Sequence, residues 1–238
     1  MSNSRPTGSS NPEIQPAISR DKRAGPLGLK AEFLSSTLGL APTSGDNVGH
    51  ESAGGPWPMS HVVVINGPAG VGKTTVSRFL VQGNSGRINI AGDALRHFAP
   101  EDVRNSLGPG STYRAGAALA AAYLAMGAAQ VLFDYVFDDA EKLDLFCSGL
   151  PLETPVFVFT LWAPIDRVID REASRVGRER MGHAVVRTYE AIERNLHTLG
   201  RVVSNTEAPE RTAQTIMEAI ANPANLWPRP APENWMIA

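Results

Sequence analysis

The chain has 238 residues, a formal net charge of −2 and one cysteine, Cys147. This charge offers no basic surplus of the kind that follows a nucleic-acid backbone, and no apolar run reaches the roughly 20 residues of a membrane span. A single cysteine excludes an internal disulfide and is typical of a reducing cytoplasm. We therefore expect a cytoplasmic protein with neither a nucleic acid nor a membrane as partner, and the sequence leaves its oligomeric state open.

Composition divides the chain into three parts. The expected parts are a disordered N-terminal leader (1–58), one domain (59–221) and a C-terminal tail that contains Pro and Trp (222–238). In the leader, apolar residues are too sparse to offset the entropy of ordering, although residues 29–40 could form a short helix. Met59 is a candidate for the natural start. In the tail, Trp227 and Trp235 should pack on the surface of the domain.

Strand and helix patterns alternate within the domain. Residues 61–66, His-Val-Val-Val-Ile-Asn, form the continuous β-branched run of a parallel strand that is buried on both faces. Further strands are expected at 87–90, 129–136, 155–161 and 201–204. Helices are expected at 73–81, 113–127, 138–148, 164–175, 184–199 and 209–221, with mixed helix and loop up to residue 110. This alternation predicts an α/β fold with a three-layer, doubly wound parallel sheet, which binds ligands at the carboxyl ends of its strands.

A glycine-rich loop, Gly-Pro-Ala-Gly-Val-Gly-Lys-Thr, occupies residues 67–74 directly after the first strand and is called the phosphate loop below. Its glycines allow a tight turn whose N–H groups converge on phosphates, and the following helix adds its positive end. Lys73 should reach the β- and γ-phosphate oxygens, and the Thr74 hydroxyl should reach Mg²⁺. The alternative is a turn that binds nothing, which the strand before it and the helix after it disfavour. The expected nucleotide-binding residues are Gly67, Ala69, Gly70, Val71, Gly72, Lys73, Thr74 and Thr75.

Two acidic residues follow strands that should end at the same edge of the sheet. Asp134 ends an apolar strand, where an acid commonly holds Mg²⁺ or its water shell, although a solvated strand end is the alternative. Asp93 follows Gly92 at the end of the second strand. Its carboxylate could accept a proton from an acceptor hydroxyl, and it could also cap the helix that begins at Ala94.

Four arginines form a cluster around residues 171–180. Arg171 and Arg175 lie four residues apart on one helix face, and Arg178 and Arg180 follow between two glycines. A basic flap of this kind would neutralise charge on a transferring phosphoryl group and exclude water. The alternative is a solvated basic end of a helix.

Signatures of other phosphate-loop proteins are absent from the sequence. No Asn-Lys-x-Asp stretch is present to read guanine and no Asp-x-x-Gly follows the second strand, which argues against a GTPase. The Asp-Gly-Tyr/Phe-Pro-Arg stretch of nucleoside monophosphate kinases is missing too. Tyr135 stands where a motor ATPase would place a water-activating Glu. These absences favour a small-molecule kinase that uses ATP.

Together the motifs resemble the chloramphenicol phosphotransferase-like P-loop kinases, whose wider relatives include shikimate kinases, gluconate kinases and zeta-type toxins. The resemblance covers roughly residues 61–221 and implies a P-loop kinase fold with an Arg-rich lid. The stretches that carry it are Val63-Val64-Ile65-Asn66 with the phosphate loop, Gly92-Asp93, Phe133-Asp134-Tyr135-Val136-Phe137, Ala163-Pro164-Ile165-Asp166-Arg167 with Arg171, and Gly177-Arg178-Glu179-Arg180.

The resemblance implies transfer of the ATP γ-phosphate to a hydroxyl of a small molecule. The implied roles are Asp93 as the base, Lys73 on the phosphates, Thr74 on Mg²⁺, Arg171 with Arg178 or Arg180 as lid arginines, and Asn205 with Thr206 at the adenine. The acceptor pocket should come from residues 94–115 and the loop after Asp134. Its candidate residues are His97, Phe98, Tyr113, Arg114, Tyr135, Phe137 and Asp138.

The sequence thus predicts an ATP- and Mg²⁺-dependent O-phosphotransferase acting on a small hydroxylated molecule. An antibiotic acceptor, with a role in resistance or self-protection, is the first expectation. Two alternatives stay open. One is a zeta-toxin-like kinase of a nucleotide sugar, and the other is an ATP-binding switch module without an acceptor.

Overall fold

The computed structural model describes residues 60–174 and 181–229. The expected leader, Met59, Trp235 and three of the clustered arginines (Arg175, Arg178 and Arg180) lie outside the described residues. Among the described residues, no helix combines the length and the apolar character that crossing a membrane requires.

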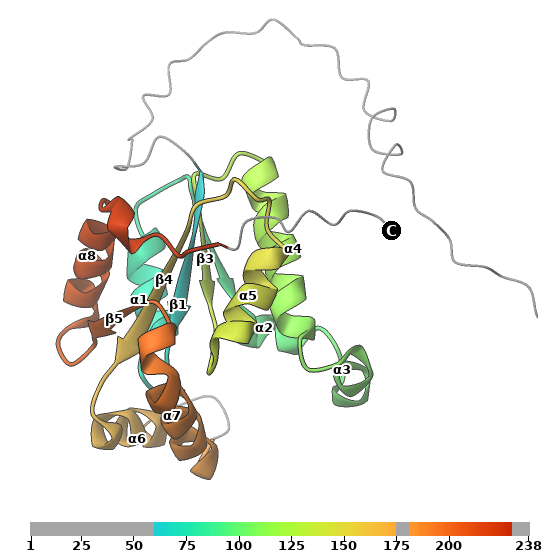
Figure 1. The fold of residues 1–238 in the computed structure, drawn as a ribbon. Coiled ribbons are helices and arrows are strands. Elements are labelled where there is room, and N and C mark those ends of the chain that lie inside the picture. Colours follow the sequence, from blue (N-terminus) through green and yellow to red (C-terminus); the bar gives the residue numbers. More distant parts are fainter. Residues whose placement is uncertain (1–59, 175–180, 230–238) are drawn as a thin grey trace, which may run out of the picture. The chain divides into compact units, whose positions relative to one another are not determined.

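The described residues build a five-stranded parallel sheet in the order β2-β3-β1-β4-β5, with helices on both faces (Figure 1). Its strands are β1 (His61–Asn66), β2 (Arg87–Ala91), β3 (Gln130–Asp134), β4 (Val156–Trp162) and β5 (Arg201–Ser204). Because β1 lies in the centre, the chain first winds towards β2 and β3 on one side and then towards β4 and β5 on the other. The expected α/β class with a doubly wound parallel sheet is confirmed.

Eight α-helices connect these strands within the described residues. They are α1 (Lys73–Val81), α2 (Gly92–Arg96), α3 (Glu101–Leu107), α4 (Ser111–Ala125), α5 (Ala140–Ser148), α6 (Ile165–Ala173), α7 (His183–Asn195) and α8 (Pro209–Ile220). Two short 3₁₀ turns follow α7 and α8, at Leu196–Thr198 and Pro223–Asn225. Figure 1 shows α1 and α8 on one face of the sheet, α4 and α5 on the other, and α6 and α7 beyond the carboxyl ends of the strands.

The first strand shows why the sequence produces this layered arrangement. Val63 and Ile65 pack into the core cluster shared with α1 and α8, while Val62 and Val64 pack into the cluster shared with α4 and α5. All four side chains are fully buried. Alternate residues of a strand point to opposite faces, and burying each such side chain stabilises the fold by about 1.5–3 kcal/mol, so a strand covered on both faces reads as an unbroken apolar run.

The strand that carries Asp134 is shorter than the sequence predicts. The N–H of Tyr135 still donates to the Ile65 carbonyl of β1, but the chain then leaves the sheet, and the N–H of Phe137 donates to the side-chain Oδ1 of Asn66 at 2.8 Å. This departure turns Tyr135 towards the carboxyl edge of the sheet and returns Phe137 to the core. The acidic strand end is therefore followed directly by the wall of the candidate site.

The first residues of the tail pack on the domain without a break. Leu226 forms an antiparallel bridge with Phe157, and the N–H of Trp227 donates to the Val156 carbonyl at 2.7 Å. The half-buried Trp227 ring contacts the core cluster beneath α4 and α5. This stretch of β4 lies before the residues that pair with β5, so the tail covers backbone that would otherwise be an open edge. We propose that the packed unit extends at least to Arg229.

Arg229 attaches this tail to the end of α5 and the loop after it through hydrogen bonds. Its guanidinium donates to the carbonyls of Cys147, Leu150, Pro151, Leu152 and Thr154. One of them, the Cys147 carbonyl, belongs to the last turn of α5, where carbonyls lack the usual donor of the helix interior.

Replacing Arg229 by alanine should lower the free energy of unfolding by about 1–3 kcal/mol, because the carbonyls lose a charged donor. Urea unfolding followed by circular dichroism measures this change. Arg211→Ala is the matched control, since its ion pair with Glu207 is largely exposed and such pairs contribute little. Equal stability of the two variants would remove the anchoring role.

Candidate functional site

The phosphate loop is wedged between the end of β4 and the helix α6. Gly67 and Gly70 adopt positive φ angles of 139° and 86°. A Cβ at Gly67 would lie 2.6 Å from the carbonyl oxygen of Leu161, and one at Gly70 would lie 2.5 Å from that of Val168. Only glycine fits these positions, and the resulting turn leads directly into α1 at Lys73. This backbone suits the expected anion cradle of loop N–H groups and a helix N-terminus, and the binding of phosphate there stays a prediction.

Lys73 lies along the inside of this loop. Its Nζ donates to the carbonyls of Gly67 at 2.8 Å and Pro68 at 3.1 Å. An ammonium held at the loop backbone is close to where the loop N–H groups would place phosphate oxygens. The contact of Lys73 with the β- and γ-phosphates stays a prediction.

Three polar side chains from three elements meet beside the phosphate loop. Thr74 Oγ1 donates to Asp134 Oδ1 at 3.3 Å, and Asn89 Nδ2 donates to Asp134 Oδ2 at 3.1 Å. The Asp134 side chain is buried, so it is not a solvated strand end. Burial raises the pKa of Asp134, and the hydrogen bond from Asn89, the charge of Lys73 and the hydrogen bond from Thr74 limit that rise.

This group suits a hard cation bound together with phosphates. Asn89 Oδ1 is buried and has no hydrogen-bond partner, and such an orphaned oxygen normally costs about 1–3 kcal/mol. Thr74, Asp134 and Asn89 together offer hydroxyl, carboxylate and amide oxygens, the ligand types that Mg²⁺ or its bound water accepts. No cluster of three or more His, Cys, Asp or Glu side chains that could hold a metal occurs in residues 60–174 and 181–229. A metal here would therefore depend on nucleotide oxygens as well, as Mg²⁺ in kinases does.

Replacing Asn89 by alanine should weaken Mg²⁺-dependent nucleotide binding by about 10- to 100-fold, because Asp134 loses the donor that orients it. Binding of a fluorescent ATP analogue, titrated with Mg²⁺, measures the effect. Asn84→Ala, in an exposed turn, is the control. A loss of affinity that is the same with and without Mg²⁺ would show that Asn89 acts on the fold and not on the metal site.

Asp93 lies within α2 and not at its cap. The helix begins at Gly92 with Ala91 as its N-cap and no capping side chain, so the expectation that Asp93 caps a helix starting at Ala94 is wrong. The carboxylate lines the cavity described next. Its helix is pressed against Tyr135, because a Cβ at Gly92 would lie 2.4 Å from Tyr135 Cδ2. Gly92 thus allows α2 to start close to the strand end that carries Asp134.

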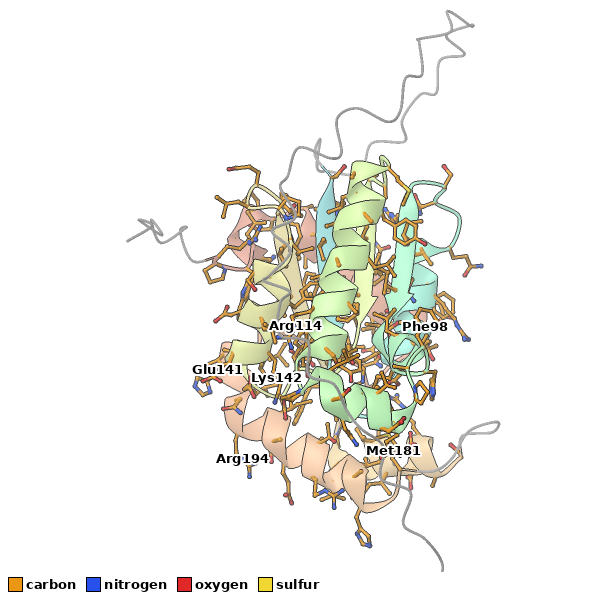
Figure 2. The ribbon with its side chains drawn as sticks, turned by 90° about the vertical axis from the view of Figure 1, so that its right-hand side faces the viewer. Phe98, Arg114, Glu141, Lys142, Met181 and Arg194 are labelled. Carbon is orange, nitrogen blue, oxygen red and sulfur yellow. The ribbon has the colours of Figure 1, made fainter. Side chains whose placement is uncertain are left out.

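A single cavity of about 240 Å³ joins the phosphate loop to the region around Asp93. On the phosphate side it is lined by Ala69, Gly70, Gly72, Lys73 and Thr74. The acceptor side, as we name it, consists of Asp93, Arg96, Tyr113, Tyr135, Val136, Asp138 and Lys142, with Met181 and Thr188 at the border. Figure 2 shows Lys142 at the lower end of α5 and Met181 near the bottom of the view, at the carboxyl edge of the sheet. The cavity therefore runs without a break from the phosphate loop to Asp93.

Three of the predicted acceptor residues line this cavity and the others do not. Tyr113, Tyr135 and Asp138 are in its wall, and the rings of the two tyrosines meet edge to face at 5.4 Å. Phe137 was expected there, but it is fully buried and packs against Phe133 and Phe146. Its prediction is wrong because the Asn66 side chain draws the backbone of Phe137 into the core.

The remaining acceptor candidates lie outside the lining. His97 is the exposed residue that ends α2, so its predicted place in the pocket wall is wrong. Phe98 is 81% exposed, and Arg114 is exposed on α4. His97 and Phe98 continue the turn that ends α2, since their N–H groups donate to the carbonyls of Ala94 and Leu95, but both side chains are exposed.

Several site residues were missed by sequence reasoning. They are Asn89, Arg96, Lys142, Met181 and Thr188. A polar residue between Ile88 and Ile90 in a buried strand was a usable signal for Asn89, and the place of Arg96 three residues after Asp93 was another. Nothing in the sequence pointed to Met181 or Thr188.

Lys142 is held at the acceptor side by two carboxylates. Its Nζ forms ion pairs with Asp138 and, at 2.7 Å, with Asp139, whose side chain also caps α5. Burial works against the charged amine, but these hydrogen bonds outweigh it and raise the pKa of Lys142. Burial likewise disfavours the charged carboxylate of Asp139, and the bonds to Lys142 prevail and lower the pKa of Asp139. One amine thus lies between two carboxylates, and the formal charge of the three side chains is −1.

Arg171 and Asn205 hold the phosphate loop from outside. Arg171 donates to the carbonyls of Val71 and Asn205, and Asn205 Nδ2 donates to Val71 at 2.6 Å while its Oδ1 accepts from Thr212. The side chain of Asn205 is thus engaged beneath the loop. Thr206 lies half-buried just beyond it. Its contact with adenine stays a prediction, as do the lid roles of Arg171, Arg178 and Arg180.

No family model and no curated protein sequence matches this chain. Among solved structures, a sugar kinase from Janibacter sp. HTCC2649 matches with a TM-score of 0.52 and 20% identity, covering 69% of this chain and 97% of that one. A gluconokinase from Sinorhizobium meliloti 1021 matches with a TM-score of 0.52 and 18% identity, covering 68% and 94%. The fold is that of P-loop kinases. At this level of identity the likeness concerns the fold alone.

Proposed function

We propose that the protein is an ATP-dependent phosphotransferase that moves the γ-phosphate to a hydroxyl of a small molecule. The observation that carries this proposal is the continuity of one cavity from the phosphate loop to Asp93. An ATPase or a switch protein needs only the phosphate side. A second compartment with a carboxylate at the junction is what a transfer between two bound molecules requires.

In the proposed reaction, the acceptor hydroxyl oxygen attacks the γ-phosphorus and forms the new P–O bond. The bond from the γ-phosphorus to the bridging oxygen breaks, its electron pair leaves with ADP, and the hydroxyl proton passes to Asp93. Lys73 and the loop N–H groups stabilise charge on the phosphate oxygens. Thr74 and Asp134, the latter oriented by Asn89, would hold Mg²⁺. When bound, that ion supplies charge neutralisation on the phosphates.

The resemblance supports the finer part of the proposal. We propose a cytoplasmic enzyme whose acceptor is an antibiotic or a related secondary metabolite, so that phosphorylation serves resistance or self-protection. Arg171, together with Arg178 or Arg180, completes the site as a lid in this proposal. The buried thiol of Cys147, whose pKa burial raises to about 12, takes no part in the chemistry.

A mass-spectrometric screen tests the proposal. The purified protein is incubated with Mg-ATP and a panel of hydroxylated antibiotics, nucleotide sugars and simple metabolites, with Lys73→Ala as the control. A product heavier by one phosphate, absent with the variant, is the expected result. A nucleotide sugar as the only acceptor would favour the toxin alternative, and ATP binding with no phosphorylated product would favour a switch module.

A further inference from the structure

The charged residues of the acceptor side are unevenly distributed. Asp138 and Lys142 lie together with Asp139 at the start of α5, and their combined charge is −1 because one amine faces two carboxylates. On the opposite element, α2, Asp93 and Arg96 line the same cavity. Lys142 is therefore already paired with carboxylates, and among the described residues that line the acceptor side Arg96 is the other cation.

Arg96 has no partner within the part of the chain that the structure describes. It is the last residue of α2, and neither an ion pair nor a hydrogen bond joins it to another residue in 60–174 or 181–229. Its charge nevertheless acts inside the cavity. Burial, followed by the nearby Tyr135 and the carboxylates of α5, raises the pKa of Tyr113, and the positive charge of Arg96 opposes that rise.

Arg96 also stands at a defined distance from Asp93. Residues three apart on a helix are neighbours, with about 5–6 Å between their Cβ atoms. A molecule whose hydroxyl reaches Asp93 therefore presents its next few atoms to the guanidinium. The planar fork of arginine pairs with carboxylate or phosphate oxygens through two parallel hydrogen bonds, which fixes orientation as well as affinity.

We propose that the acceptor is a small hydroxylated anion and that Arg96 binds its carboxylate or phosphate group while Asp93 receives the hydroxyl. This inference rests on the proposed phosphotransferase function and names the class of its acceptor. Arg96 is a solvent-exposed residue of the cavity lining, so its charge is hydrated in the free protein and accessible to a bound anion. Tyr113 and Tyr135 line the same cavity and add uncharged surface to it.

Matched pairs of ligands test the inference by calorimetry on the protein loaded with Mg²⁺ and a non-hydrolysable ATP analogue. The probes are gluconate against glucose, glycerate against glycerol, and glycerol 3-phosphate against glycerol. At least one anion should bind more tightly than its neutral counterpart. The pairs also show whether a carboxylate or a phosphate group is preferred.

Variants then assign the effect to Arg96. Arg96→Ala should weaken binding of the anion by about 10- to 100-fold and Arg96→Lys by less, since a charge remains but the bidentate pairing is lost. Arg114→Ala is the control, because Arg114 is an exposed arginine of α4 outside the lining (Figure 2). Circular dichroism confirms that each variant is folded.

The inference is overturned if no anion binds, if neutral and charged members bind equally, or if Arg96→Ala binds the anion as well as the wild type does. These outcomes differ from a failure of the proposed function. Transfer of phosphate to a neutral member would uphold the kinase and reject the anionic acceptor. Arg96-dependent binding of an anion without transfer under Mg-ATP would uphold the anion site and reject the kinase.

Discussion

Replacing Asp93 by asparagine will lower kcat by about 10²- to 10⁴-fold and leave the affinity for ATP unchanged, because the amide cannot accept the proton of the acceptor hydroxyl. Asp93 lines the cavity from α2 and is not part of the phosphate loop. Steady-state kinetics with the acceptor found in the screen measures kcat, and equilibrium titration with an ATP analogue measures the affinity.

Asp102→Asn is the matched control, since Asp102 is an exposed acid in the first turn of α3 and lies outside the cavity lining. A second feature separates the chemical role from a structural one. The asparagine variant should unfold at the same temperature as the wild type. A kcat within about threefold of the wild-type value would remove Asp93 from the role of base.

Replacing Asp134 by asparagine will abolish stabilisation by Mg-ATP without weakening the free protein. At a ligand concentration of 100 times Kd, the wild type gains about 2.7 kcal/mol, and a variant that binds 100-fold more weakly gains only about 0.4 kcal/mol. Thermal unfolding with and without Mg-ATP measures both values. Asp144→Asn, an exposed position on α5, is the control.

The stability of the free protein follows from the pKa of Asp134. Burial raises that pKa in the folded protein, so the folded state binds the proton more tightly than the unfolded state does. Ionised Asp134 therefore costs stability above its folded pKa, and the cost shrinks as the pH falls below that value and is gone below the unfolded pKa. At pH 7 the variant should be as stable as the wild type or more stable, and the difference should shrink in acid. A variant that is less stable at pH 7 would contradict this account.

The central strands of the fold could be predicted because a strand that is buried on both faces appears in the sequence as a continuous apolar run. The run at residues 61–66 matches β1, and the helix at 73–81 matches α1 residue for residue. The region between β2 and α4 could not be resolved in the same way. The helix α3 has no buried residue, and its seven residues contain only two apolar side chains, Val103 and Leu107, both of which are exposed, which is too weak a pattern to predict a helix.

The phosphate side of the site could be predicted, and the acceptor side only in part. A phosphate loop is contiguous, so Lys73 and Thr74 can be named from spacing alone. The partners of Asp134 cannot be named from spacing, because they depend on which strands lie side by side in the sheet. Asn89 reaches Asp134 because β2 pairs with β3, which is distant in the chain. Phe137 illustrates the opposite error, since its ring is fully buried against Phe133 and Phe146, and these contacts form only in the folded chain.

The most direct test of the account is the stoichiometry of the reaction. With Mg-ATP and the acceptor present, the phosphorylated acceptor, ADP and inorganic phosphate are quantified together over one time course. The account predicts one phosphorylated acceptor for each ADP, with both products reduced in parallel by Asp93→Asn. Release of inorganic phosphate in place of a phosphorylated acceptor, unchanged by Asp93→Asn, would contradict the claim that one cavity joins donor and acceptor.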